Sequence, residues 1–506
     1  MTIHHHIERL IQYGLQKKLI SEWEIDYVYN SLLQLFKVEE VIPSTSMMNE
    51  YLDTPVPILE NMLDYAFQIG LIEDNTVTER DLFDPKIMNQ LMPRPSEVIS
   101  EFFKRYETVG AKSATHYFYQ LSQDSHYIRT DRIRKNKHWL SKTEYGDLEI
   151  TINLSKPEKD PTAIAKAKLK PSASYPKCLL CKENVGYAGS FNHPARENHR
   201  IIPIELETEQ WFLQYSPYVY YNEHAIILSG EHRPMKISIE GFDRLLHFTE
   251  QFPHYFIGSN ADIPIVGGSI LSHDHYQGGH HEFPMAKAPT DVTFSIEGYE
   301  DIEAGIVRWP MSVIRLIGVN RKRVSELAGV ILDSWRGYSD EKADILAETD
   351  DGPHNTITPI ARNRDGKFEL DLVLRNNRTN EQYPMGIFHP HEEVHHLKKE
   401  NIGLIEVMGL AVLPGRLVNE LNQLAEYILQ EELETKAIKD KQTAHHFPWA
   451  QEIVGKYGRL TRENIHEMIQ QEIGKRFSIV LEHAGVFKRN KEGKDAFFRF
   501  IEQIKQ

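Results

Sequence analysis

The sequence predicts a mixed fold in which helices stand at both ends of the chain and strands fill the middle. Residues 1 to about 105 place apolar side chains three or four positions apart, which is typical of amphipathic helices. Residues 417–506 are charged and are also expected to be helical. Between these regions, residues 149–154 and 368–375 alternate in polarity, as half-buried strands do. Strand, loop, strand and His-x-His occur in this order twice, so the sequence indicates an internal duplication.

Length and composition narrow the class of protein. A chain of 506 residues is too long for one small core, and 41% hydrophobic with 26% charged residues is typical of a globular protein. No apolar stretch approaches the roughly 18 residues of a membrane span, and the N-terminus lacks the pattern of a signal peptide. A net charge of −15 argues against binding to nucleic acid. Two cysteines are too few for a disulfide scaffold, and a reducing cytoplasm fits them.

The N-terminal helices show no residues that indicate chemistry. Proline residues interrupt them at Pro55, Pro57, Pro93 and Pro95. Ser96 is expected to cap the helix that follows, because serine is a favoured helix N-cap residue. We therefore expect this region to form an accessory layer.

The most informative stretch is residues 267–279, where a glycine-bearing apolar run leads into two histidines. If the run is a strand, His273, His275 and Gln277 project from one face, because side chains alternate along a strand. Gly267 and Gly268 would let the backbone approach a bulky ligand such as a phosphate. Two imidazoles and an amide on one face can serve as nucleophile, metal ligand and hydrogen-bond donor.

A neutral imidazole can attack phosphorus at neutral pH and form a phosphoramidate, which divides one substitution into two steps. Such an attack needs donors for the non-bridging oxygens of the phosphate. Gln277, Ser269 and Ser272 are suited to that role. A bare His-x-His is also found as a metal ligand pair or as a hydrogen-bonded core feature, and the glycines and glutamine here favour chemistry.

Two further features suggest a metal site and a phosphate site. Cys178 and Cys181 have the C-x-x-C spacing with which two thiolates coordinate one metal ion, although a redox pair has the same spacing. His232 and His273 follow strand-like runs and are candidates to complete four ligands. Lys156 and Lys159 follow the predicted strand of residues 149–154, where both ammonium groups could reach one phosphate.

Several of these motifs occur together in one known protein family. The run from His273 to Gln277, the C-x-x-C pair and residues 192–203 and 215–224 resemble the galactose-1-phosphate uridylyltransferase family of the histidine-triad superfamily, in its longer second type from Gram-positive bacteria. For that type the resemblance covers nearly the whole chain. It implies an α+β fold with duplicated histidine-triad-like antiparallel sheets, or half-barrels, flanked by helices. We accordingly expect an N-terminal helical region at 1–140, an N-terminal catalytic half at 141–300, a C-terminal half at 301–416 and a C-terminal helical region at 417–506.

The resemblance also implies roles for individual residues. The second histidine of the family motif is the uridylylated nucleophile, which is His275 here, and Gln277 matches the glutamine that hydrogen-bonds the transferring phosphoryl group. In the shorter type of the family, the cysteine pair and two histidines bind zinc. The matching set here is Cys178, Cys181, His232 and His273. Lys156 and Lys159 fall where that type has two arginines near the nucleotide phosphates.

Some positions match the family less well. The shorter type carries proline where Asp274 stands, and this chain has one more residue between Ser269 and His273, which affects the role of the serine. The shorter type also has an additional iron site. Its ligands correspond to His354, His389 and His391, with Glu282 as the candidate fourth ligand at a different spacing.

The resemblance implies a ping-pong transfer of UMP from UDP-glucose to galactose 1-phosphate, giving UDP-galactose and glucose 1-phosphate, in the Leloir pathway of galactose metabolism. Such a transfer needs no ATP, nicotinamide or flavin. The expected enzyme is a cytoplasmic homodimer with a structural zinc. One alternative is a nucleotide phosphorylase or adenylyltransferase of the same superfamily. Another is a metal-stapled scaffold without activity.

Overall fold

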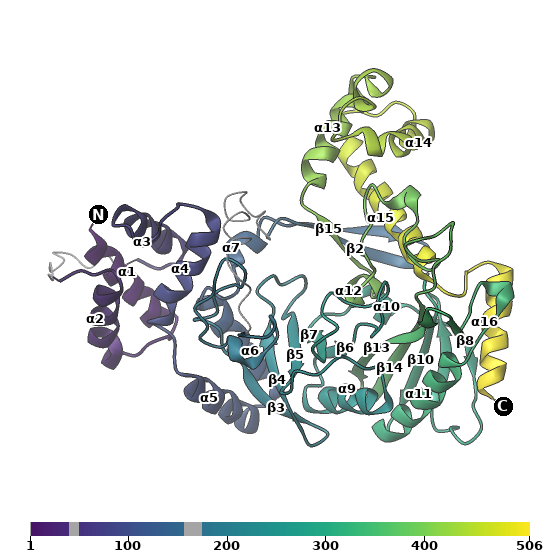
Figure 1. Ribbon diagram of the computed structural model, residues 1–506, viewed down its shortest axis with the longest axis horizontal. Helices are drawn as coiled ribbons and strands as arrows, with labels where there is room; N and C mark the ends of the chain where they lie inside the picture. Colours follow the sequence, from purple (N-terminus) through teal and green to yellow (C-terminus); the bar gives the residue numbers. More distant parts are fainter. Residues whose placement is uncertain (1, 40–49, 156–174, 506) are drawn as a thin grey trace. The chain divides into compact units, whose positions relative to one another are not determined.

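The computed structural model describes residues 2–39, 50–155 and 175–505, and it falls into two compact units (Figure 1). The first unit comprises Met1–Lys135 and Ser155–Arg233, and the second comprises Asn136–Leu154 and Pro234–Gln506. Each compact unit combines segments that are distant in sequence. The four regions expected from the sequence, with boundaries at residues 140, 300 and 416, are instead consecutive along the chain. That four-part division stays a prediction.

The first unit begins with helices, as the apolar spacing predicts. Within the described residues these are α1 (Ile3–Gln16), α2 (Ile25–Leu35), α3 (Val56–Gln68), α4 (Val77–Asn89), α5 (Pro95–Thr108), α6 (Ala111–Asp124) and α7 (Thr130–Ile133). The prediction that Ser96 caps α5 is wrong, because the helix already begins at Pro95. Proline is favoured at the first helical position, where its missing N–H costs nothing, and Glu97 accepts a hydrogen bond from the Arg94 backbone N–H at 2.8 Å.

The first unit also contains three antiparallel strands, β3 (Ile202–Leu206), β4 (Glu209–Tyr215) and β5 (Ala225–Ser229). β4 is the central strand, and its Trp211, Leu213 and Tyr215 are fully buried. Tyr215 donates a hydrogen bond to the Thr115 carbonyl on α6 at 2.9 Å, which ties the strands to the helices. His232 lies three residues beyond the end of β5.

The second unit is built on antiparallel strands in the order β7-β6-β13-β14-β10-β9-β8. Their bounds are β6 (Phe256–Gly258), β7 (His275–Gly279), β8 (Thr290–Phe294), β9 (Glu303–Val307), β10 (Val313–Gly318), β13 (Asn355–Arg364) and β14 (Lys367–Asn376), and a small hairpin of β11 (Glu348–Thr349) and β12 (Gly352–Pro353) precedes β13. Because β6 pairs with β13, strands from before and after residue 300 run together in one sheet. The predicted strand at residues 368–375 is confirmed as β14.

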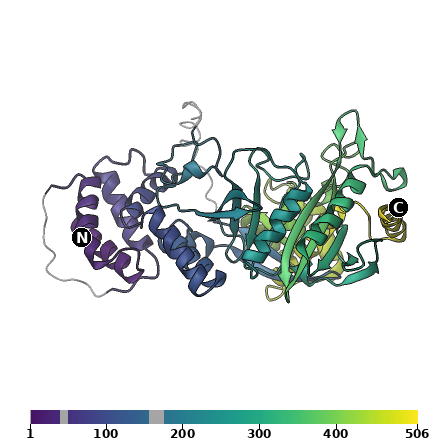
Figure 2. The same ribbon diagram turned by 90° about the horizontal axis from the view of Figure 1, so that it is seen from below.

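Helices α9 (Ile239–Gln251) and α11 (Arg321–Arg336) pack against each other and against β13 (Figures 1 and 2). Leu245, Leu246 and Phe248 of α9 are fully buried, and the Ser238 side chain caps the helix by accepting from the Gly241 N–H. α9 also packs against β6, which is the partner of β7. The strand that carries His275 is therefore anchored to a well-packed helix.

A second sheet of this unit has the order β1-β2-β15, formed by β1 (Lys137–Thr143), β2 (Gly146–Asn153) and β15 (Leu410–Pro414). β2 confirms the strand predicted at residues 149–154. The helices of this unit also include α10 (Pro284–Lys287), α12 (Leu404–Val407), α13 (Leu417–Leu429), α14 (Phe447–Tyr457), α15 (Ile465–Ala484) and α16 (Lys491–Ile504). The predicted mixed α+β class with antiparallel sheets and helical ends is thus confirmed. Among the described helices, none combines the length and apolar character that a membrane crossing needs.

Candidate active site and metal centre

His275 is the first residue of β7, and its imidazole is buried, with 6% of the residue exposed. Its Nδ1 lies 2.8 Å from the backbone carbonyl oxygen of His273. A carbonyl oxygen can only accept, so Nδ1 carries the proton and Nε2 presents its lone pair. Burial lowers the pKa of His275 to about 4, so the ring is neutral at neutral pH. This is the state that a nucleophilic imidazole requires.

Gln277 follows two positions later on the same face of β7, as the strand period requires. Its Oε1 atom is buried and has no hydrogen-bond partner among the described residues. The oxygen and nitrogen of a side-chain amide are interchangeable by a flip, so this end of the amide can equally present N–H donors. A buried amide end without a partner is costly unless a ligand completes it. His275 and Gln277 therefore share a face, whereas His273 lies just before the strand.

Close packing around Gly267 and Gly268, which precede β7, explains why glycine stands at both positions. A Cβ atom on Gly267 would lie 2.5 Å from the Ile263 carbonyl oxygen, and one on Gly268 would lie 2.8 Å from Asn260 Nδ2. Both glycines are therefore required by the packing of the loop on itself, and their approach to a phosphate stays a prediction. Ser269 and Ser272 are exposed in the same loop.

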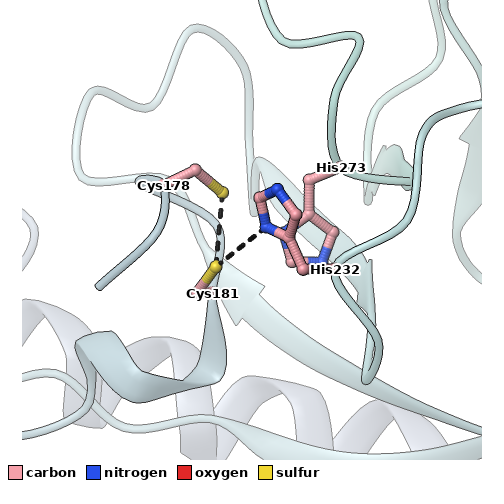
Figure 3. A group of neighbouring side chains, drawn as sticks. All are labelled: Cys178, Cys181, His232 and His273. Carbon is pink, nitrogen blue, oxygen red and sulfur yellow. Dashed lines mark hydrogen bonds between the residues drawn. The ribbon is translucent and has the colours of Figure 1, made fainter. Parts of the chain in front are cut away.

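Cys178, Cys181 and His232 of the first unit bring their ligand atoms within 4.8 Å of one another. The two sulfur atoms are 3.5 Å apart, and Cys181 Sγ lies 3.2 Å from His232 Nδ1. Figure 3 draws these side chains together with His273, the predicted fourth ligand, which belongs to the second unit. The cysteines are free thiols, because a disulfide would hold the sulfurs about 2.05 Å apart.

The donor set and its spacing fit zinc. Two sulfurs at about 2.3 Å from one tetrahedral ion would stand about 3.8 Å apart, which is close to the observed separation of 3.5 Å. Burial raises the pKa of the Cys181 thiol to about 11, so a cation is needed to hold this sulfur as a thiolate. An adjacent imidazole nitrogen favours a metal over a redox pair. Three cysteine and histidine ligands of the first unit could thus hold zinc.

Asn184 holds the cysteine loop, and sequence reasoning gave it no role. It is 2% exposed, and its Nδ2 donates to the carbonyls of Cys178 at 2.9 Å and Cys181 at 2.7 Å. His193 Nε2 lies 2.5 Å from Asn184 Oδ1, which fixes the amide from the other side. The position of Asn184, three residues after Cys181, was the only signal in the sequence.

The structure does not gather the residues predicted for a second metal. His354 has both ring nitrogens within 2.7 Å of side-chain partners, Asn377 and Thr349. Glu282 is exposed and pairs with Arg364 and Lys287. Among the described residues, His391 is instead grouped with Glu393 and His483, and neither His354, His389 nor Glu282 belongs to a potential ligand group. The second metal stays a prediction.

Two predicted phosphate ligands, Lys156 and Lys159, lie outside the described residues. A residue that sequence reasoning missed is Arg244 on α9. Its Nε donates to the Tyr276 hydroxyl at 2.9 Å, and its guanidinium lies 3.9 Å from the Asp274 carboxylate. The sequence held no signal for this contact, because Arg244 stands 30 positions before Asp274 on a different element.

A buried neutral histidine with a fixed tautomer follows from the geometry of β7, and Gln277 of the same strand has an amide oxygen without a hydrogen-bond partner among the described residues. These features fit a histidine that transfers a nucleotidyl group. Comparison with known proteins makes the assignment specific. Residues 18–234 match the family described as galactose-1-phosphate uridyl transferase, N-terminal domain, and residues 248–450 match the C-terminal domain of the same family. The chain belongs to the galactose-1-phosphate uridylyltransferase family, whose members are nucleotidyltransferases.

Individual relatives agree over the full length. A protein of Halalkalibacterium halodurans named galactose-1-phosphate uridylyltransferase is 58% identical over 500 residues, covering 99% of this chain and 98% of its own. The protein of the same name from Bacillus subtilis is 54% identical over 504 residues, covering 100% and 98%. A crystal structure of the yeast Ap4A phosphorylase Apa2 covers 66% of this chain and 89% of its own at 10% identity, with a TM-score of 0.31, too low to define a shared fold.

Proposed function

We propose that this enzyme transfers UMP from UDP-glucose to galactose 1-phosphate, giving glucose 1-phosphate and UDP-galactose. The names of its full-length relatives support the substrates. The geometry of His275 supports the mechanism, because its Nδ1 is bonded to the His273 carbonyl oxygen at 2.8 Å and its Nε2 keeps a lone pair. The reaction belongs to galactose metabolism in the Leloir pathway, and we place the enzyme in the cytoplasm as a homodimer.

The transfer proceeds in two displacements at the α-phosphorus. His275 Nε2 attacks, the bond to the β-phosphate oxygen breaks, and glucose 1-phosphate leaves with the electron pair. A phosphate oxygen of galactose 1-phosphate then attacks the same phosphorus, and the P–N bond breaks. In the intermediate the imidazole is positively charged, and the hydrogen bond from Nδ1–H to the His273 carbonyl stabilises that charge.

Gln277 supplies a hydrogen bond to a non-bridging oxygen while the phosphoryl group is transferred. The buried and unpartnered end of its amide supports this role. Ser269, Ser272 and the Gly267–Gly268 backbone are proposed to contact the same substrate, and Lys156 and Lys159 its phosphates. These groups would supply local donors to the substrate phosphates, which the overall negative charge of the protein does not attract.

A zinc ion is proposed on Cys178, Cys181, His232 and His273. When bound, the ion provides a structural link, since four protein ligands leave no open position for substrate. His273 would then have two roles in this chain. Its side chain would bind the ion, and its backbone carbonyl holds the His275 tautomer.

The test is the covalent intermediate. Purified enzyme is incubated with UDP-glucose carrying 32P in the α-phosphate, and we expect about one equivalent of label on wild-type protein and none on His275→Gly. A matched variant, His281→Gly, lacks a histidine two residues after the end of β7, whose Nε2 lies 3.0 Å from the Glu149 carboxylate, and it should still be labelled. ADP-glucose in place of UDP-glucose tests the related adenylyltransferase reaction. Full labelling of His275→Gly would exclude the proposed mechanism.

A further inference from the structure

The two residues that flank His275 in sequence are held by a single arginine. Side chains alternate along a strand, so Tyr276 points away from the face that carries His275 and Gln277. Arg244 on α9 donates its Nε–H to the Tyr276 hydroxyl at 2.9 Å. The terminal NH2 of the same guanidinium lies 3.9 Å from Asp274 Oδ2, which is the range of an ion pair but longer than a hydrogen bond.

All three side chains are buried. The exposed fractions are 7% for Arg244, 4% for Asp274 and 3% for Tyr276. Removing two charges from water is costly, and a buried pair is retained only when its geometry is good and other hydrogen bonds satisfy the remaining donors. Arginine suits such a site because its planar group offers five donors in a fixed arrangement. An arginine at this position can therefore contact Asp274 and Tyr276 at once.

The helix that presents Arg244 is itself well packed. Leu245 and Leu246, the next residues of α9, are fully buried. The helix packs on β6, whose Gly258 pairs with Gln277 of β7. The guanidinium thus connects this helix to the residues before and after His275 on the strand.

We propose that Arg244 is a positioning residue, which acts through Asp274 and Tyr276 to hold the His275 imidazole in its attacking orientation. The proposal rests on the proposed function, in which His275 is the nucleophile. The Nδ1–H of His275 reaches the His273 carbonyl, and that carbonyl belongs to the peptide group whose nitrogen is that of Asp274. A shift of Asp274 therefore moves the acceptor that fixes the tautomer, while a shift of Tyr276 moves the strand that carries the ring.

The test uses conservative variants that keep the site filled. Arg244→Lys retains the positive charge for Asp274, but a single ammonium group cannot reproduce both contacts. Tyr276→Phe removes one contact and keeps the ring. We expect the single-turnover rate of His275 labelling by UDP-glucose to fall on the order of 10- to 100-fold in Arg244→Lys and about 5-fold in Tyr276→Phe, as for a nucleophile misplaced by a fraction of an ångström. The affinity for UDP-glucose should change less than about twofold.

The double variant Arg244→Lys/Tyr276→Phe should label little more slowly than Arg244→Lys alone, because both changes break the same contact. The control is Arg323→Lys on α11, a half-buried arginine paired with Asp301 at 3.1 Å, which should label at the wild-type rate. Thermal midpoints of all variants report any loss of folding. If the labelling rates fall only in proportion to the folded fraction, Arg244 is merely structural and the proposal is overturned.

A second readout separates this proposal from the proposed function. In 15N NMR spectra of histidine-labelled protein, with His275 assigned by comparison with His275→Gln, the wild-type ring should show a protonated Nδ1 and an unprotonated Nε2. Arg244→Lys should show a mixture of tautomers, and Arg323→Lys should not. This result holds even if UDP-glucose fails to label the wild-type protein, which would overturn the proposed function alone. An unchanged tautomer in Arg244→Lys would overturn the role of Arg244.

Discussion

The chain carries the His-x-His motif twice, and the two copies lie in opposite chemical environments. At His275 one ring nitrogen is bonded to a carbonyl within the motif itself, and the neighbouring Gln277 has a buried amide oxygen without a partner among the described residues. At the second copy, the His389 ring has its Nδ1 3.2 Å from the Pro390 carbonyl oxygen and its Nε2 3.3 Å from the Asn401 side-chain amide. The first copy thus adjoins a buried amide oxygen without a partner among the described residues, whereas both ring nitrogens of His389 lie beside polar groups.

The second His-x-His is also packed differently. The His391 ring is stacked between Tyr383 and His483, with ring centroids 4.2 Å apart on each side. Its Nε2 donates to the Ile387 carbonyl at 3.0 Å. Such a ring stabilises the loop that contains it. The comparison teaches that the motif alone does not define a reactive site, and that the decisive feature is which polar atoms the fold leaves available.

The largest expected effect concerns metal binding. Cys181→Ser should lower the zinc content from about one ion per chain to nearly none, because a hydroxyl is a poor zinc ligand. The thermal midpoint should fall with it, since metal binding contributes to folding free energy. Zinc is measured by mass spectrometry of protein purified from zinc-supplemented cells. His389→Ala and His391→Ala are the matched controls, and loss of zinc in these variants would show that the second motif binds the ion.

Parts of the fold and of the site were predictable from the sequence, whereas the contrast between the two His-x-His motifs was not, and the reasons are physical. Alternating polarity predicted strands at residues 149–154 and 368–375, and both are confirmed. The expectation that they are half-buried is wrong, because the fold buries both faces and pairs polar side chains such as Asp371 with Arg315. The cysteine pair follows from local spacing. Arg244 could not be predicted, since the contact depends on how α9 packs beside β7. His389 and His391 were expected to bind a metal because they match ligands of the shorter type of the family, and the sequence does not show which polar partners the fold gives a histidine ring.

A smaller effect is expected for the polar group beside the nucleophile. Gln277→Ala should lower the rate of uridylyl transfer about 10²-fold, as loss of one donor to a developing charge does. Asn401→Ala removes an amide that contacts the second His-x-His at His389 and should change the rate less than about twofold. Both rates come from conversion of UDP-glucose and galactose 1-phosphate at saturating substrate. Equal losses in the two variants would contradict the distinction between the motifs.

The smallest effect tests whether the second motif is structural. His391→Phe keeps a flat ring between Tyr383 and His483 but removes the hydrogen bond to Ile387. A lost hydrogen bond costs ~1 kcal/mol, which corresponds to a thermal midpoint lower by about 2 °C in a domain of this size. The transfer rate should stay within about twofold of wild type. A tenfold loss of activity together with loss of a bound metal would instead mean that His391 is a ligand. The Nδ1 atom of His391 would then bind the metal while Nε2 stays bonded to the Ile387 carbonyl, and the two copies of the motif would share a chemical role after all.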